Sequence, residues 1–167
     1  THRRYERRSN CRYGACFSGI MRWAYVNAAL GIPLQGPSGA SAHIRDVCFA
    51  LQEQVELRIF SALAADHRGS FGPKIVARTY KRPLSLFKRY RELQEIVLAR
   101  KMAKDILSLD WKPDILLERH SLFSDVSWRI AEKRGIPWCL EVNAPIFEER
   151  SRYEHLRFPS MGRTWQR

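Results

Sequence analysis

The fold of this chain is decided by residues 21–51, which read MRWAYVNAALGIPLQGPSGASAHIRDVCFAL. The run WAYVN (23–27) is rich in aromatic and β-branched residues, which favours a buried strand. The segment GIPLQGPSGAS (31–41) is a loop rich in glycine and proline. Four apolar residues then fall at i, i+3, i+4 and i+7, on one face of a helix: Ile44, Val47, Cys48 and Leu51.

A strand, a glycine-rich loop and a helix in this order form a unit that can bind an anion. The first N–H groups of the helix are free to donate, and the helix dipole favours negative charge there. Gly39 lets a ligand approach the backbone because it has no Cβ, and Ser38 and Ser41 are candidate N-caps. The spacing G-x4-G-x2-G is neither GxGxxG nor a Walker loop. The pattern alone therefore leaves two alternatives open, a phosphate-binding loop and a simple connection.

The remaining sequence alternates between apolar strands and helices. Strands are expected at 55–62, about 75–77, 114–117 and 138–142. Helices are expected at 41–54, from Pro83 to about 109, from a cap at Ser124 to Arg134, and at about 147–155. Gly135 marks the end of the third helix. This order predicts an α/β fold in which a doubly wound, Rossmann-like parallel sheet is the middle of three layers, in a single domain with the first strand central.

Composition is typical of one globular domain. The chain has 167 residues, of which 45% are hydrophobic and 28% charged. It contains neither an apolar run of about 18 residues nor a secretory signal pattern at its start. The cysteines lack zinc-site spacing, so we expect no metal and a reducing, cytoplasmic compartment. Cys48 and Cys139 lie in apolar patterns and are interpreted as small buried hydrophobes.

The net charge of +12 is concentrated in two segments. Residues 1–20 carry five arginines against one glutamate and show no periodicity, so we expect a disordered basic extension before a natural start near Met21. A nucleic-acid-binding arm is the alternative for this segment. Residues 78–104 carry nine lysines or arginines against two glutamates. Such local excess indicates an anionic partner or a tail, rather than a uniformly basic fold.

Polar residues follow several of the predicted strands. They are the loop 31–41, the group Glu118–Ser121 and the group Glu141–Asn143. The carboxyl ends of parallel strands meet at one edge of the sheet, and ligands of doubly wound folds bind beyond that edge. We therefore expect the three groups to converge on one site.

Three segments together resemble the N-terminal domain of family-four glycosyltransferases of the GT-B fold: GIPLQGPSGASAHIRDV, PDILLERHSLFS and GIPWCLEVNAP. The resemblance covers Met21 to about Pro159. It implies retaining transfer of a sugar from a nucleotide-sugar donor to an acceptor, without a cofactor or a metal. It also implies that residues 21–160 form the acceptor-side domain and that residues 161–167 begin a linker or tail. The C-terminal donor domain would be absent from this sequence, so the chain alone is expected to be inactive.

The resemblance assigns roles to individual residues. The donor diphosphate would be bound by Gly36, Ser38, Gly39, Ala40 and Ser41. The acceptor would be bound by Gly31, His43, Glu118, Ser121, Glu141 and Asn143. Many relatives have a histidine near the acceptor, and here Arg119 and His120 both fit that position as catalytic candidates, with the choice left open. Glu118 and Glu141 could equally pair with an arginine for structural reasons.

The basic helix expected over residues 83–104 has two interpretations. It presents either an ordinary solvated face or a surface for anionic phospholipid, because lysine and arginine are interleaved with leucine, phenylalanine and tyrosine. A peripheral position at the inner face of the membrane would suit a lipid-linked acceptor, the alternative being a sugar acceptor.

Other function classes fit less well. A nucleic-acid-binding module would be favoured by the basic charge, but no RNP, KH or zinc motif is present, so no nucleic-acid partner is expected. A dinucleotide-binding Rossmann module would need an acidic residue at the end of the second strand, where Ser61 and Ala62 stand.

Overall fold

The computed structural model describes residues 19–62, 76–80 and 90–165. The expected disordered extension over residues 1–20 lies almost wholly outside the described residues. Within the described ranges the strands are β1 (Arg22–Asn27), β2 (Glu56–Ser61), β3 (Val76–Thr79), β4 (Ile115–Arg119) and β5 (Trp138–Glu141). The helices are α1 (Gly39–Gln52), α2 (Arg91–Ser108), α3 (Val126–Arg134), α4 (Ile146–Tyr153) and α5 (Pro159–Trp165).

The five strands form one parallel sheet in the order β3-β2-β1-β4-β5, so β1 is central, as the sequence predicts. The register aligns the last residue of every strand in one row across the sheet: Thr79, Ser61, Asn27, Arg119 and Glu141. All five side chains are polar or charged. The carboxyl edge of the sheet is therefore a continuous polar edge, where a doubly wound fold binds its ligand.

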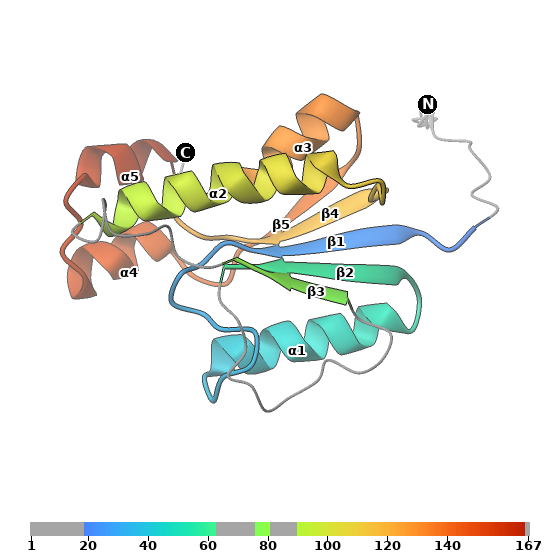
Figure 1. The fold of residues 1–167 in the computed structure, drawn as a ribbon. Coiled ribbons are helices and arrows are strands. Elements are labelled where there is room, and N and C mark those ends of the chain that lie inside the picture. The colour runs from blue at the N-terminus through green and yellow to red at the C-terminus, as the bar shows by residue number, and fades with distance from the viewer. Residues whose placement is uncertain (1–18, 63–75, 81–89, 166–167) are drawn as a thin grey trace, which may run out of the picture.

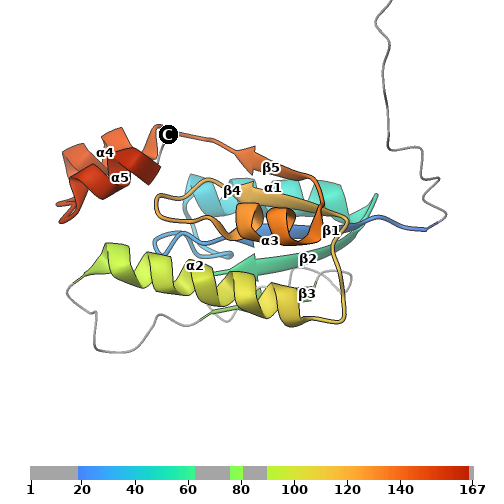
Figure 2. The same ribbon diagram turned by 90° about the horizontal axis from the view of Figure 1, so that it is seen from above.

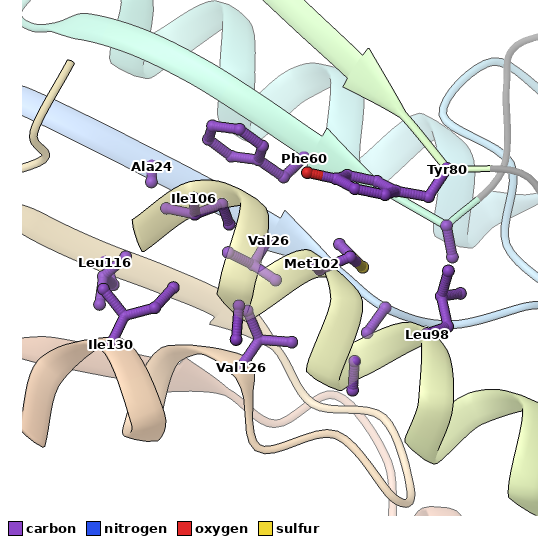
Figure 3. Close-up of a cluster of buried hydrophobic side chains, with 14 of the residues drawn as sticks. Ala24, Val26, Phe60, Tyr80, Leu98, Met102, Ile106, Leu116, Val126 and Ile130 are labelled. Atoms are coloured by element: carbon purple, nitrogen blue, oxygen red, sulfur yellow. The ribbon is translucent and has the colours of Figure 1, made fainter. Parts of the chain in front are cut away.

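Helices cover both faces of the sheet, which confirms the three-layer prediction. Figure 1 and Figure 2 show α1 on one face and α2 and α3 side by side on the other. Alternation along β1 sends Tyr25 into the apolar cluster under α1, and Ala24 and Val26 into the cluster under α2 and α3. Figure 3 shows this second cluster, where Leu98, Met102 and Ile106 of α2 pack on the sheet.

Local signals set the ends of two helices. Ser38 is the N-cap of α1, and its hydroxyl oxygen accepts the Ser41 N–H at 3.2 Å. The helix therefore begins at Gly39, two residues before the predicted start. Gly135 ends α3 in the left-handed conformation with φ of 65°, which a glycine adopts without steric cost.

Two predicted helix starts are wrong. The helix predicted from Pro83 begins at Arg91, because Tyr90 has φ of −129° and ψ of 83°, outside the helical region; residues 81–89 lie outside the described residues. The N-cap position of α3 is Asp125 rather than Ser124. The Ser124 hydroxyl donates to the Glu118 carboxylate, and that carboxylate, rather than Ser124, accepts the Ser127 N–H at the start of the helix.

The interpretation of Cys139 as buried is also wrong. Cys139 is exposed, as are its neighbours Trp138 and Leu140. An apolar run indicates a buried strand only when neighbours cover both of its faces. β5 lies at the edge of the sheet, and the described helices leave its first three side chains open to solvent.

The sequence pattern did not predict α5. The residue at which we expected a linker or tail to begin, 161, lies inside this helix. Trp165 fixes α5 to the body of the domain. Its indole N–H donates to the Ser124 carbonyl at 3.3 Å, and its ring meets that of Phe123 edge-on at 5.8 Å. None of the described helices is both long enough and apolar enough to cross a bilayer.

Candidate functional site

Glu141, the last residue of β5, is the centre of a polar cluster. Its Oε1 accepts from Arg119 Nη1 at 2.9 Å and from the Asn143 amide, and lies 2.9 Å from His43 Nε2. Its Oε2 accepts from the Tyr25 hydroxyl at 3.2 Å. The four partners come from β1, α1, β4 and the segment after β5. A carboxylate held in this way is fixed in orientation, and His43 and Asn143 on its outer side are exposed.

The side chains of adjacent residues in β4 lie on opposite faces of the sheet, so Glu118 and Arg119 contact different parts of the domain. Arg119 points to the α1 side, where it joins Glu141. Glu118 points to the α3 side and is only 2% exposed. Its carboxylate accepts the Ser127 N–H at 2.7 Å and the Ser124 hydroxyl, so it satisfies a free donor at the start of α3.

Burial raises the pKa of Glu118, against the effect of the hydrogen bonds from Ser124 and Ser127. A carboxyl whose pKa is higher in the folded state stabilises the fold most below its unfolded pKa of about 4.3, and this contribution is lost as pH rises through the folded pKa. We therefore expect Glu118→Gln to gain stability relative to the native chain as pH rises from about 5 to about 8. The amide keeps an acceptor for Ser127 and a donor for Ser124. Urea unfolding at the two pH values measures the difference.

Glu118→Ala is the matched comparison. It removes both hydrogen bonds and leaves the Ser127 N–H unsatisfied, so it should be less stable than the native chain at both pH values. A glutamine variant that loses stability as pH rises would contradict the assigned role of the buried carboxyl.

His120 follows β4 and points to the α2 side, away from Arg119. It lines a cavity of about 260 Å³, together with Gly31 and Ser121 and with residues of α2 and α4. Its Nδ1 is buried and has no hydrogen-bond partner among the described residues. Burial lowers the pKa of His120, which favours the neutral imidazole. Arg119 and His120 are thus not equivalent candidates: one belongs to the Glu141 cluster and the other to this cavity.

A ring of four alternating charges closes the cavity on the side of α2 and α4. Arg150 donates to Glu95 at 2.8 Å and to Glu154 at 2.9 Å, and Arg91 donates to the same two carboxylates at 3.1 and 2.9 Å. Arg150 and Glu95 are 9% and 5% exposed. Burial raises the pKa of Glu95, although Arg150 and Arg91 act in the opposite direction. The ring holds α2 and α4 together around the cavity.

The glycine-rich loop is tightly packed around Gly36, between Pro33 and the Ser41 side chain, and is open at Gly39. The Ser41 hydroxyl donates to the Pro33 carbonyl at 2.7 Å. A Cβ on Gly36 would lie 2.8 Å from Pro33 Cγ and 2.9 Å from Ser41 Oγ, whereas a Cβ on Gly39 would meet no atom within 4 Å. The start of α1 is therefore accessible, and His43, one turn along the helix, connects it to Glu141.

Alanine should consequently have opposite effects at the two glycines. Gly36→Ala forces the loop apart, and overpacking of this kind costs about 1–3 kcal/mol. Gly39→Ala has room for its methyl group and gains helix propensity, so we expect it to be neutral or slightly stabilising. Thermal unfolding of the two variants side by side measures the contrast. Equal stability of the two variants would contradict the observed packing of the loop.

Several residues of the site were missed by sequence reasoning. Tyr25 and Asn27 were treated only as parts of a strand, yet Tyr25 donates to Glu141. The Asn27 amide donates to the Ile32 carbonyl at 2.9 Å and to Ser61 Oγ at 3.0 Å. Arg45 donates to the Gly36 carbonyl at 3.0 Å, which brings a guanidinium beside the loop. Helical spacing from Ser41 could have revealed Arg45, because i and i+4 share a face.

Comparison with known proteins supports the fold. No protein-family model matches the chain, and a search of curated proteins finds no significant match. Among solved structures, the C-terminal domain (residues 78–226) of the PF1911 hydrogenase from Pyrococcus furiosus is similar with a TM-score of 0.52 and 8% identity, over 73% of this chain and 92% of that one. TcCGT1, a UDP-glycosyltransferase solved in complex with UDP, is similar with a TM-score of 0.51 and 15% identity, over 74% of this chain and 28% of that one. At these identities the likeness concerns the fold.

Proposed function

We propose that this chain is the acceptor-side domain of a glycosyltransferase that takes its sugar from a nucleotide-sugar donor. The observation that carries the proposal is the contact between His43 and Glu141, at 2.9 Å. It brings an open helix N-terminus, suited to a diphosphate, next to a fixed carboxylate, suited to sugar hydroxyls. Both lie at the carboxyl edge of the sheet. The shared fold with a UDP-glycosyltransferase supports the same conclusion.

The start of α1 receives the donor diphosphate. The Ser41 N–H is already used by the Ser38 cap, so the N–H groups of Gly39 and Ala40 donate to the phosphate oxygens. Arg45 adds positive charge beside them. Negative charge grows on the diphosphate as its bond to the sugar breaks, and donors fixed in advance stabilise that charge without reorganisation.

The Glu141 cluster orients the reacting sugar. Arg119 and Tyr25 hold the carboxylate from inside, while His43 and Asn143 can give up their bonds to it in favour of hydroxyl groups. The cavity beside His120 receives the acceptor. Its volume of about 260 Å³ is near the small end of ligand pockets, about 300–1,000 Å³, and suits a group the size of one sugar. Retention of configuration, and the absence of a cofactor and a metal from the reaction, belong to this proposal.

Chemical-shift mapping with UDP tests the phosphate part of the proposal on this chain alone. Millimolar UDP should shift the amide signals of Gly39, Ala40 and His43. Arg45→Gln should weaken the titration, whereas Lys112→Gln removes the same charge before β4, at the edge of the sheet opposite the start of α1, and should leave it unchanged. Shifts confined to α3 or to β5, with α1 unaffected, would contradict the assigned site.

A further inference from the structure

A basic groove lies between α2 and α3, outside the candidate site. It has a volume of about 690 Å³ and is lined by four basic residues and a single acidic one: Arg100, Lys104, Arg129, Lys133 and Glu132. Arg129 is paired with Asp125 at 2.7 Å. The other three basic residues form no salt bridge with any described residue. Within the described part of the chain, the groove therefore holds three basic side chains that no salt bridge neutralises.

An apolar groove of about 570 Å³ lies on the other side of α3, against the start of β5. Its lining consists of Trp128, Ala131, Glu132, Gly135, Ile136, Pro137 and Trp138. The two tryptophans are 46% and 38% exposed, which is unusual for a side chain that is highly buried on average. Tryptophans beside a basic surface are typical of proteins that lie at the interface of a bilayer.

One helix joins the two grooves. Trp128 and Glu132 form one row along α3, and Arg129 and Lys133 form the next row. The two rows together make up the outer face of α3, opposite its buried side chains. Figure 1 and Figure 2 show α3 beside α2 on the same side of the sheet. We propose that the outer face of α3, with the groove on each side of it, docks onto an anionic lipid bilayer. Lipid phosphates bind in the basic groove, and Trp128 and Trp138 insert at the level of the headgroups.

The lining of the grooves favours a bilayer over nucleic acid. Proteins that bind single-stranded nucleic acid place aromatic side chains along the same cationic track as the phosphates. Here Trp138 lies across α3 from the basic groove, beside Ile136 and Pro137, and of the two tryptophans only Trp128 is near a basic residue of that groove, Arg129, whose guanidinium lies 6.0 Å from its ring. Apart from Glu132, the groove beside the tryptophans is lined by uncharged residues, so it does not continue a cationic track for a nucleic-acid backbone. The net charge of +12 supplies the long-range attraction to anionic lipid.

This proposal refines the expectation for residues 83–104 and does not depend on glycosyl transfer. Residues 83–89 lie outside the described residues, and Arg91 is bound in the charge ring with Glu95 and Glu154. The available charge is instead at Arg100 and Lys104. These lie about 14 and 20 Å along α2 from Arg91, which lines the candidate cavity. Docking would thus hold that cavity close to the bilayer.

Sedimentation of the 167-residue chain with lipid vesicles tests the proposal. The chain should bind vesicles of phosphatidylglycerol and phosphatidylcholine in equal parts, and bind pure phosphatidylcholine far less. Each lysine removed from an anionic interface weakens binding about fivefold. The double variant Lys104→Gln/Lys133→Gln should therefore bind about 25-fold more weakly. The matched control Lys112→Gln/Arg152→Gln loses the same charge elsewhere on the surface and should bind almost as the native chain does.

Tryptophan quenching by brominated lipid tests the orientation. Binding should quench the native chain, and Trp128→Phe/Trp138→Phe should lose most of the quenching while it keeps binding. Equal losses of binding in the two charge variants would overturn the proposal, because general attraction by net charge would then explain the binding. Absence of vesicle binding, with an RNA oligonucleotide bound through Lys104 and Lys133, would also overturn it and assign the groove to nucleic acid.

Discussion

Replacing Arg150 with methionine is expected to lower the free energy of unfolding by about 3–5 kcal/mol. Arg150 is the more buried arginine of the charge ring and donates to both Glu95 and Glu154. Methionine fills part of the same volume but leaves the buried Glu95 carboxylate with Arg91 alone. For a chain of this size the loss corresponds to a decrease in Tm of about 6–20 °C, measurable by calorimetry.

The destabilisation should depend on pH in a defined direction. Arg150 opposes the effect of burial on the pKa of Glu95, so its removal raises that pKa further. A carboxyl with a raised folded pKa loses its stabilising contribution as pH rises through that pKa. The gap between Arg150→Met and the native chain should therefore widen from acidic to neutral pH. A constant gap would mean that packing, and not the unpaired carboxylate, causes the loss.

Two further variants separate these causes. In Glu95→Leu/Arg150→Met the buried pair is replaced by apolar side chains, which is often neutral or stabilising, so much of the stability should return. Arg152→Met changes an exposed arginine on the same helix and should have an effect within about 0.5 kcal/mol. A double variant less stable than Arg150→Met would show that the ring contributes more than the pairing of one buried charge.

Most of the fold could be predicted from the sequence because its signals are local. The apolar run at Trp23–Asn27, the period of α1 and the stop at Gly135 each depend on nearby residues only. The errors arise where distant residues decide. Cys139 is exposed because β5 is at the edge of the sheet. The helix α5 is held in place by contacts of Trp165 with Ser124 and Phe123, which lie about 40 positions earlier in the chain. No pattern within a single segment contains that information.

The sequence predicts at which edge of the sheet the candidate site lies, but not which of its side chains pair with one another. The rule that ligands bind at the carboxyl edge of a parallel sheet located the ends of β1, β4 and β5. The pairing of Arg119 with Glu141 depends on the register between β4 and β5. The separation of Arg119 from His120 depends on which face each strand residue occupies. Pairs such as Arg150 and Glu95, 55 positions apart, require coordinates.

The isolated chain is expected to bind nucleotide-sugars with a Kd weaker than about 1 mM and to catalyse no measurable transfer. Under the proposed function, a donor domain outside this chain supplies the charged groups that grip the diphosphate and the ribose. Hydrogen bonds to charged groups contribute about 1.5–3 kcal/mol each. The absence of about three removes about 5–9 kcal/mol, which turns a micromolar site into one weaker than millimolar. Titration calorimetry with common nucleotide-sugars measures this directly.

Under the proposed function, joining the chain to a glycosyltransferase donor domain should restore transfer, and that transfer should depend on Gly39. The start of α1 alone contributes only about 0.3–1 kcal/mol to an anion, so it cannot replace the missing contacts. In the joined enzyme Gly39→Val should abolish transfer, because its side chain occupies the space through which the diphosphate reaches the backbone. A Cβ at Gly39 meets no atom within 4 Å, so the variant should still fold, and Gly39→Ala should lose less activity. Tight donor binding by these 167 residues alone would instead mean that the donor site is complete within the chain, and the proposed division into two domains would have to be abandoned.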